Sequence, residues 1–163
     1  MLVCLRIFAS LEIEKYKSYD KEENNKMIKT GNPNQWSANY PAESTIRRDI
    51  AQGDCYLLYE CGKPIATFVA KAGPEPNYHR IDNGSWLDDQ PYYVIHRVAS
   101  LEGVHGVMAD IINYCSAFTS SIRIDTHADN RPMQASLIRL GFVYCGIIYV
   151  ENGDSRLAFQ RVF

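Results

Sequence analysis

Residues 92–142 place the strongest constraint on how this chain folds. They open with an apolar run, residues 92–99, which is typical of a buried strand, and Gly103 and Gly106 punctuate the turn that follows. From Val107 onward the apolar residues recur at the spacing of one helical stripe. This half of the segment therefore predicts a strand, a glycine turn and a helix in immediate succession.

The other half of the segment predicts a second strand and a second helix. Ile122 and Ile124 alternate with charged residues, as in a strand with one buried face. Asn130 then precedes an Arg-Pro pair, which is a cap residue followed by a proline suited to the first helical turn. Because a helix connects them, we expect the strands at residues 92–99 and 122–125 to be parallel.

The glycine turn has the chemistry of an anion site. N–H groups at the start of a helix lack partners within the helix, and the helix dipole adds partial positive charge. Glycine also lets a phosphate approach the backbone closely. We therefore expect a phosphate-bearing ligand at this turn, while a plain strand-to-helix connection explains the same glycines. The residues concerned are Gly103, Val104, His105, Gly106, Val107 and Met108.

The rest of the chain completes a mixed sheet with helices on both faces, in one domain of residues 1–163. The helix before residue 30 has a thin apolar face, so we expect it on the surface or frayed. In the next helix Arg47, Arg48 and Asp49 are expected to face solvent. The additional strands are predicted at residues 2–8, 55–59, 65–70, 142–150 and 156–161, the helices at 11–29 and 44–50, and a long loop at 71–91.

Composition narrows the classes of function. A formal charge of −2 argues against a general nucleic-acid or anionic-membrane binder. No apolar run approaches the ~20 residues needed to span a bilayer, and the N-terminus lacks the basic leader of a signal peptide. The five cysteines are an odd number and form no CxxC pair, so we expect reduced thiols in a cytoplasmic protein.

Three segments carry a resemblance to a known family. They are TGNPNQW…YP, HRVAS…GVHGV and IRIDTHADNRPMQASLIRLGFVYCGIIYV, and with the element order they resemble the GNAT (GCN5-related N-acetyltransferase) superfamily over roughly residues 30–163. The resemblance implies an α/β (α+β) fold, with a mixed, mostly antiparallel sheet, a central splayed parallel strand pair and helices on both faces. It also implies that acetyl-CoA, as co-substrate, binds between residues 92–99 and 122–125, with its pyrophosphate on the glycine turn.

The activity implied is direct transfer of an acetyl group to an amine of a small molecule or peptide, without a covalent enzyme intermediate. The family-based candidates for stabilising the oxyanion are the backbone N–H groups near Val98 and Ala99. His96 is the best candidate for the general base, because histidine changes charge near neutral pH, and a histidine satisfied beneath the sheet is the alternative. The tyrosine that often serves the family as acid is replaced by Leu137, so Tyr144 is a substitute acid or a core-packing ring.

Other candidate site residues also have two explanations. Asn130 either hydrogen-bonds the cofactor or caps its own helix. The aromatic residues either line the acceptor pocket or pack at the edge of the sheet. No metal is expected, because the histidine near residue 125 has no second histidine at ligand spacing. The aromatic candidates are Trp36, Tyr40, Tyr78 and Trp86.

A second function remains open, namely a GNAT-like domain that binds acyl-CoA as a sensor or scaffold and has weak or no catalysis. Leu137 favours it, as does a pyrophosphate pattern that the chain matches only at its central glycine, Gly106. A dinucleotide-binding domain is disfavoured, because no GxGxxG run follows the first strand. The sequence allows a monomer or a homodimer.

Overall fold

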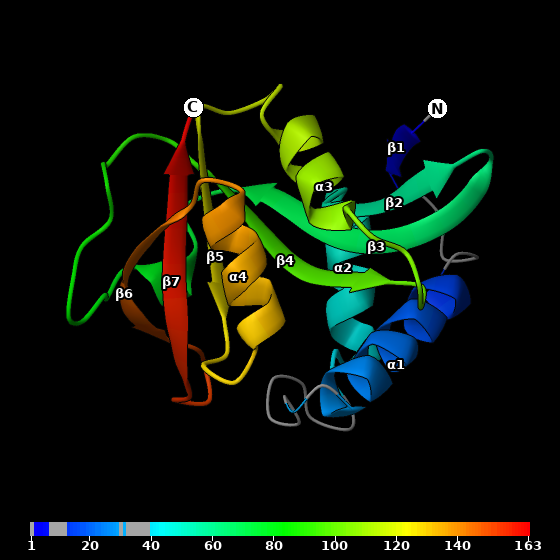
Figure 1. The fold of residues 1–163 in the computed structure, drawn as a ribbon, viewed down its shortest axis with the longest axis horizontal. Helices are drawn as coiled ribbons and strands as arrows, with labels where there is room; N and C mark the ends of the chain where they lie inside the picture. The colour runs from blue at the N-terminus through cyan, green and yellow to red at the C-terminus, as the bar shows by residue number, and fades with distance from the viewer. Residues whose placement is uncertain (1, 7–12, 30, 32–39) are drawn as a thin grey trace.

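The computed structural model of the chain describes residues 2–6, 13–29, 31 and 40–163. Within these ranges helices and strands follow one another much as the sequence predicts (Figure 1). The elements are β1 (Leu2–Arg6), α1 (Ile13–Lys29), α2 (Glu43–Gln52), β2 (Cys55–Glu60), β3 (Lys63–Ala72), η2 (Pro76–Tyr78), β4 (Tyr93–Ser100), α3 (Val107–Cys115), β5 (Ser121–Thr126), α4 (Arg131–Arg139), β6 (Val143–Tyr149) and β7 (Ser155–Val162).

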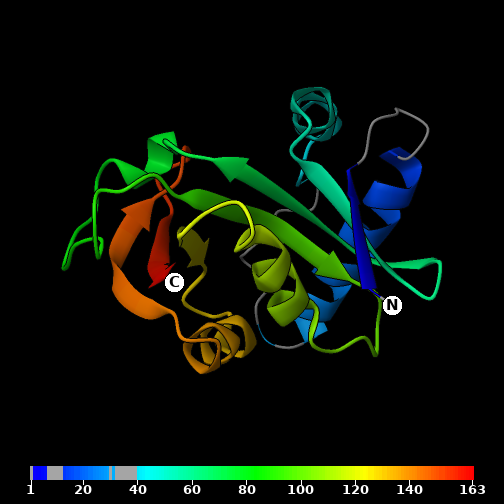
Figure 2. The same cartoon turned by 90° about the horizontal axis from the view of Figure 1, so that it is seen from above.

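The strands form one seven-stranded sheet in the order β1-β2-β3-β4-β5-β7-β6. Every pair of neighbours is antiparallel except β4 and β5, which are parallel and joined by α3. This confirms the predicted mixed, mostly antiparallel sheet with a central parallel pair. Helices cover both faces: α3 and α4 lie on one side of the sheet and α2 on the other, while α1 crosses the end of β4 (Figure 2).

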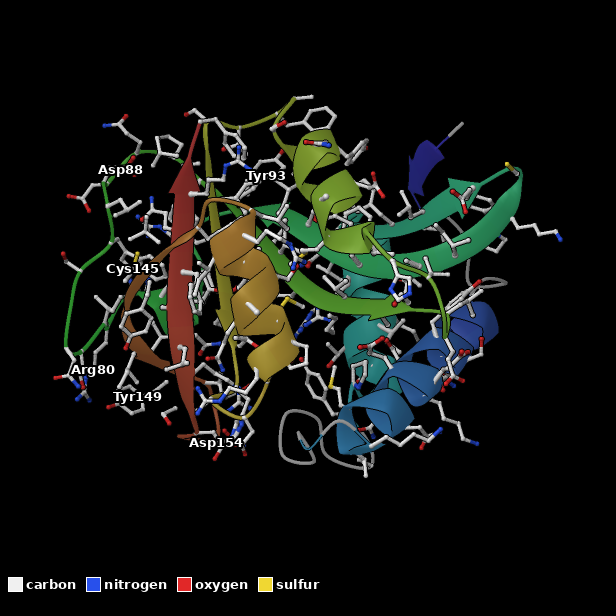
Figure 3. All side chains as sticks on the ribbon, in the orientation of Figure 1. Arg80, Asp88, Tyr93, Cys145, Tyr149 and Asp154 are labelled. Atoms are coloured by element: carbon white, nitrogen blue, oxygen red, sulfur yellow. The ribbon has the colours of Figure 1, made fainter. Side chains whose placement is uncertain are left out.

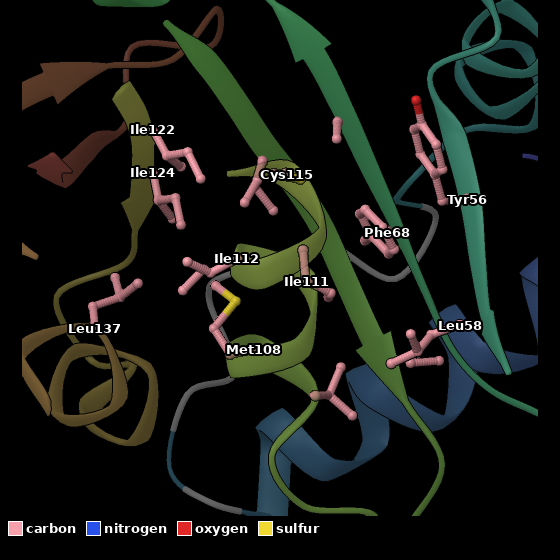
Figure 4. Packing of buried hydrophobic residues seen from close by; sticks show 14 of the residues in the cluster. Tyr56, Leu58, Phe68, Met108, Ile111, Ile112, Cys115, Ile122, Ile124 and Leu137 are labelled. Atoms are coloured by element: carbon pink, nitrogen blue, oxygen red, sulfur yellow. The ribbon is translucent and has the colours of Figure 1, made fainter. Parts of the chain in front are cut away.

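The largest core lies between the sheet and the face of α3 and α4 (Figure 4). The helical stripe predicted from Val107 onward is buried against it, because the spacing puts each apolar residue on one side of α3. Leu137 of α4 and Ile122 of β5 are fully buried in the same cluster. This packing holds α3 over the region between β4 and β5.

Two expectations about solvent exposure were wrong. Helix α1, expected on the surface, buries Tyr19, Asp20 and Met27, because it packs with α2 over β2, β3 and β4. Asp49 of α2, expected in solvent, is only 3% exposed and forms an ion pair with Arg97. In both helices a carboxylate faces the sheet, which the apolar pattern alone does not reveal.

The long loop before β4 returns to the edge strand β6. Asp82 forms an isolated antiparallel bridge with Ile147, and the guanidinium of Arg80 lies 4.9 Å from the ring centre of Tyr149 (Figure 3). A Cβ on Gly84 would lie 2.0 Å from the carbonyl oxygen of Cys145, so only glycine fits there. The loop thereby covers part of the free edge of β6, which would otherwise be open to pairing with another strand.

Candidate active site

Strands β4 and β5 pair only at their N-terminal ends. Tyr93 lies opposite Ile122 and Val94 opposite Arg123, and no further pair joins the two strands. From Ile95 onward the strands diverge, which confirms the splayed parallel pair. The β4 edge beyond this point therefore presents backbone groups that β5 does not bind.

The opposite edge of β4 is interrupted by a bulge. His96 pairs with Val69 and Ala99 with Thr67, so two residues of β4 face a single residue of β3. The first of the two, Arg97, has a φ of 49°, a conformation that is uncommon for a residue with a side chain. Backbone strain of this kind is concentrated at functional sites, and here the strained residue lies close to the point at which β4 and β5 diverge.

Beyond the bulge, backbone N–H groups on the open edge are bound by carboxylates of α1. Leu101 donates its N–H to the carbonyl oxygen of Ile65 in β3, so the N–H groups of its two neighbours point the other way. Ser100 N–H donates to Oε2 of Glu23 at 3.2 Å. Glu102 N–H donates to Oε1 of Glu22 at 2.8 Å. Two anionic groups therefore lie at the open edge of β4.

The glycine turn leads into α3 as expected. Gly106 caps the helix with a φ of 81°, and Gly103 also has a positive φ of 78°. The N–H groups of Ala109 and Asp110 donate to the carbonyl of Gly106. In the described part of the chain, nothing accepts from the N–H groups of Gly106, Val107 or Met108. Three amides at the start of a helix are thus available to an anion.

His96 lies on the α1/α2 face of the sheet, between two carboxylates. Its Nε2 is 3.3 Å from Oε2 of Glu75, and its Nδ1 is 3.8 Å from Oδ1 of Asp125. Lys71 binds the same oxygen of Glu75 at 2.8 Å. The hydroxyl of Tyr92 accepts the N–H of Glu75 at 3.1 Å and so fixes that residue's backbone.

Burial and charge set the ionisation of this cluster. Burial raises the pKa of Glu75, but hydrogen bonds from His96 and Lys71 outweigh it and bring the pKa down to about 2. Glu75 is therefore ionised and accepts the proton on Nε2 of His96. Burial, with the anionic Asp125 beside it, raises the pKa of Tyr78 well above its ordinary value, so its hydroxyl donates to Oδ1 of Asp125 at 2.7 Å. His96 is left with Nδ1 as its proton-accepting nitrogen.

The predicted aromatic residues that the structure describes lie in two separate places. Tyr78 is buried, and Trp86 donates to its carbonyl oxygen at 3.0 Å while the two rings lie 5.1 Å apart, beside His96. Tyr40 lies elsewhere, in the wall of a cavity between α1 and α2 that Lys17, Asp20 and Ile46 also line. Its hydroxyl is 3.5 Å from Nη1 of Arg97. Trp36 lies outside the described residues.

The side chains of two further candidates, Asn130 and Tyr144, both make contacts within the fold. Asn130 accepts the N–H of Met133 at 3.2 Å through its side chain and so caps α4. Tyr144 is half-exposed and packs edge-on against Phe159, which belongs to the core under α3 and α4. His96 points to the other face of the sheet, so the structure does not bring Tyr144 and His96 together.

Sequence reasoning missed the two acidic groups that surround His96 and the bulge that follows it. Glu75 is 21 residues away in sequence, inside a loop, and no local pattern links it to β4. Arg97 has a positive φ although it is not a glycine. The sequence therefore contains no signal that predicts a bulge at this position. Only the general signal of a long loop in a compact fold pointed to residues 71–91.

Within the described ranges, two kinds of site are absent, a membrane-spanning helix and a metal-ligand cluster. None of the helices there combines the length and the apolarity needed to cross a membrane. In the same residues no three His, Cys, Asp or Glu side chains come together as ligands for a metal ion.

The architecture matches solved acetyltransferases. A GNAT family acetyltransferase from Streptococcus agalactiae aligns with a TM-score of 0.86 and 28% identity, over 99% of this chain and 95% of that chain. The chain is a GNAT-fold protein. This confirms the resemblance seen in the sequence over roughly residues 30–163, and the alignment covers more of the chain than that range.

More distant structures share the GNAT fold alone. One from Listeria monocytogenes, also a GNAT family acetyltransferase, gives a TM-score of 0.72 at 17% identity, over 99% of this chain and 95% of that one. Arabidopsis thaliana Naa50, in complex with the bisubstrate analogue CoA-Ac-MVNAL, gives 0.59 at 12% identity over 99% of both chains. No model of a protein family matches the sequence, and no curated protein matches it.

Proposed function

We propose that this chain is an N-acetyltransferase that moves an acetyl group from acetyl-CoA to the amine of a small molecule or peptide. The observation that carries the proposal is the open, bulged edge of β4, with His96 one residue before the bulge. GNAT-fold structures hold CoA-derived ligands, as the Naa50 complex does. The N-acetyltransferases among them support an amine acceptor for this chain as well.

The residues of this chain fit an acyl-CoA donor. The free amides of Gly106, Val107 and Met108 suit its pyrophosphate, with Gly103, Val104 and His105 completing the turn. Beside the bulge, the backbone of Val98 and Ala99 is proposed to hold the thioester end, and the register favours Val98, because Ala99 lies opposite Thr67 in the ladder. Asn130 contributes by capping α4 rather than by a free side chain.

The chemistry requires transfer of the acetyl group, removal of a proton from the amine nitrogen and protonation of the leaving thiolate. The amine nitrogen attacks the thioester carbonyl, the new C–N bond forms as the C–S bond breaks, and CoA leaves as a thiolate that is protonated by solvent. His96 accepts the amine proton at Nδ1, and Glu75 holds the ring through Nε2. Amides at the bulge stabilise the oxyanion, and binding both partners side by side supplies proximity.

Thiol release from acetyl-CoA over a panel of small and peptide amines tests the proposal. Wild type is expected to release CoA and to form acetylated amine with at least one of them. His96→Gln is expected to lose about 10²-fold or more in kcat, while His79→Gln, at an exposed histidine, keeps full activity. Equal activity of wild type and His96→Gln would overturn the role of His96.

A domain that binds acyl-CoA without catalysis is the second candidate. It is favoured by Leu137, which is fully buried where the family often places its acidic tyrosine. Calorimetric binding of acetyl-CoA without thiol release for any amine would support it. A cytoplasmic location and a monomeric or homodimeric state stay predictions.

A further inference from the structure

Arg123 of β5 is a buried cation at the point where the sheet opens. The residue is 5% exposed and lies opposite Val94 in the last pair that joins β5 to β4. Within the described ranges, no carboxylate forms an ion pair with its guanidinium, and its Nε has no hydrogen-bond partner. Because buried charges in proteins are normally paired, this position requires an explanation.

Two aromatic rings from the segment before β4 lie against the guanidinium instead. Cζ of Arg123 is 3.8 Å from the ring centre of Tyr92 and 4.3 Å from that of Trp86. Nη2 also donates to the backbone carbonyl oxygen of Asp88 at 2.6 Å. Aromatic faces stabilise an arginine, and they do so more strongly where water is excluded. Arg123 thereby holds both rings, and the backbone near them, against β5.

Tyr92 connects Arg123 to one of the two carboxylates beside His96. Its hydroxyl accepts the N–H of Glu75 at 3.1 Å. The ring also lies against Gly73, where an added Cβ would be 2.7 Å from the ring atom Cζ. The place of the hydroxyl, and with it the backbone of Glu75, therefore depends on a ring that Arg123 and Gly73 hold.

Trp86 connects Arg123 to the other carboxylate. Its Nε1–H donates to the carbonyl oxygen of Tyr78 at 3.0 Å, and the two rings lie 5.1 Å apart. The hydroxyl of Tyr78 in turn donates to Oδ1 of Asp125 at 2.7 Å. Asp125 comes two residues after Arg123 in β5, so both side chains lie on the same face of the sheet.

Resting on the proposed role of His96 in acetyl transfer, we propose that Arg123 is a positioning residue that selects the tautomer of His96. Glu75 and Asp125 face opposite nitrogens of the ring, at 3.3 and 3.8 Å. The carboxylate of Glu75 takes the Nε2 proton because it is held in place, whereas Oδ1 of Asp125 already accepts a hydroxyl proton. Both arrangements depend on rings that Arg123 holds. Without Arg123 they relax, and a form with the proton on Nδ1, which cannot act as base there, becomes populated.

The test is long-range ¹H–¹⁵N correlation NMR of the imidazole rings in the full chain, without CoA, at the alkaline end of the histidine titration. The chain has four histidines, and the signals missing from His96→Gln belong to His96. Wild type is expected to hold about nine-tenths or more of His96 in the Nε2–H form, and Arg123→Met about a third or more in the Nδ1–H form. Arg139→Met, at an exposed arginine of α4, should match wild type. A folded Arg123→Met with the wild-type tautomer would overturn the inference.

Milder variants test the same links, also where Arg123→Met does not fold. Tyr92→Phe and Trp86→Phe keep a ring over the guanidinium but remove the hydroxyl and the N–H that lead to Glu75 and Tyr78. Each is expected to move part of the His96 population to the Nδ1–H form. Arg123→Lys keeps a cation over the rings and is expected to lie between wild type and Arg123→Met. A tautomer unaltered in both ring variants contradicts the inference.

Thiol release separates this inference from the proposed function. The kcat of Arg123→Met is expected to fall about tenfold, because less of His96 can accept the amine proton. Acetylation of an amine by wild type, with the same His96 tautomer in every variant, removes the role of Arg123 alone. A tautomer that responds as expected, without acetylation of any amine by wild type, removes the acetyltransferase function alone.

Discussion

Nε2 of His96 lies 3.3 Å from Oε2 of Glu75, and this contact decides which nitrogen of the ring can take a proton. The carboxylate is ionised and accepts only, so Nε2 carries the hydrogen and Nδ1 is left for chemistry. Lys71 binds the same oxygen, and Tyr92 fixes the backbone of Glu75, which together keep the carboxylate in place. Glu75 is thus a positioning residue for His96.

Replacing Glu75 by glutamine is expected to lower kcat by about tenfold or more with a small effect on the KM for acetyl-CoA. Glutamine is neutral and can also donate to Nε2, so both the tautomer and the charge balance at His96 change. The pH dependence of kcat should shift along the pH axis as kcat falls. If the role of Glu75 were purely structural, the variant would lose thermal stability and its pH dependence of kcat would be unchanged. Glu151→Gln, in the exposed β6–β7 turn, serves as the matched control.

Glu75 should also make stability depend on acid pH. Its pKa is about 2 in the folded chain, below the ordinary 4.5, so its contribution is present above about pH 4.5 and is lost as pH falls toward 2. The contribution is on the order of 3 kcal/mol, because the group is well buried. Urea unfolding of wild type and Glu75→Gln should show a gap at neutral pH that closes in acid. A gap that is independent of pH would show that the charge of Glu75 is not responsible.

The carboxylates of Glu22 and Glu23 should oppose binding of the acyl donor. They occupy the N–H groups of Glu102 and Ser100 on the open edge of β4, close to the turn proposed for the pyrophosphate. The double variant Glu22→Gln, Glu23→Gln is therefore expected to bind CoA several-fold more tightly at low salt, with a smaller gain at high salt. Calorimetry at two salt concentrations measures this, with Glu60→Gln as control. Weaker binding by the double variant would instead mean that these contacts hold the site in shape.

Asp20 should lower stability at neutral pH. Its folded-state pKa of about 8 lies above the ordinary 3.8, so its favourable contribution exists below about pH 4 and is lost as pH rises to 8. Asp20→Asn lacks this loss and should be more stable than wild type near pH 7, by on the order of 3 kcal/mol. The measurement is thermal unfolding of wild type and Asp20→Asn between about pH 4 and pH 8. Both proteins keep the neighbouring charged residues Arg97, Glu23, Lys21 and Asp49. A less stable Asp20→Asn would mean that the carboxylate makes a favourable contact.

Most of the fold could be predicted because each element satisfies a local rule. The stripe that begins at Val107 is buried along one side of α3, and Gly53 ends α2 in the left-handed conformation that glycine commonly adopts after a helix. The Asn-Gly pair at residues 152–153 closes the last hairpin. Where prediction failed, in α1 and at Asp49, burial depends on tertiary contacts of charged side chains, which carry no periodic signal.

The candidate site was less predictable than the fold. His96, Gly106 and Asn130 stand in segments with recognisable patterns, and the structure describes each in a defined local environment. Glu75 and Asp20 were not anticipated, because each meets its neighbours across distant parts of the sequence. The same holds for Glu22 and Glu23, whose contacts with Glu102, just after β4, and with Ser100, at its end, span 80 and 77 residues.

Arg97 has two structural roles, one through its backbone and one through its side chain. Its backbone forms the bulge in β4, and its guanidinium binds Asp49 and so ties α2 to the strand. An exchange at this position would disturb the shape of the strand and the seating of the helix at once. A substitution in α2 that displaces Asp49 would therefore also act on the bulge of β4, beside which the acyl donor is proposed to bind.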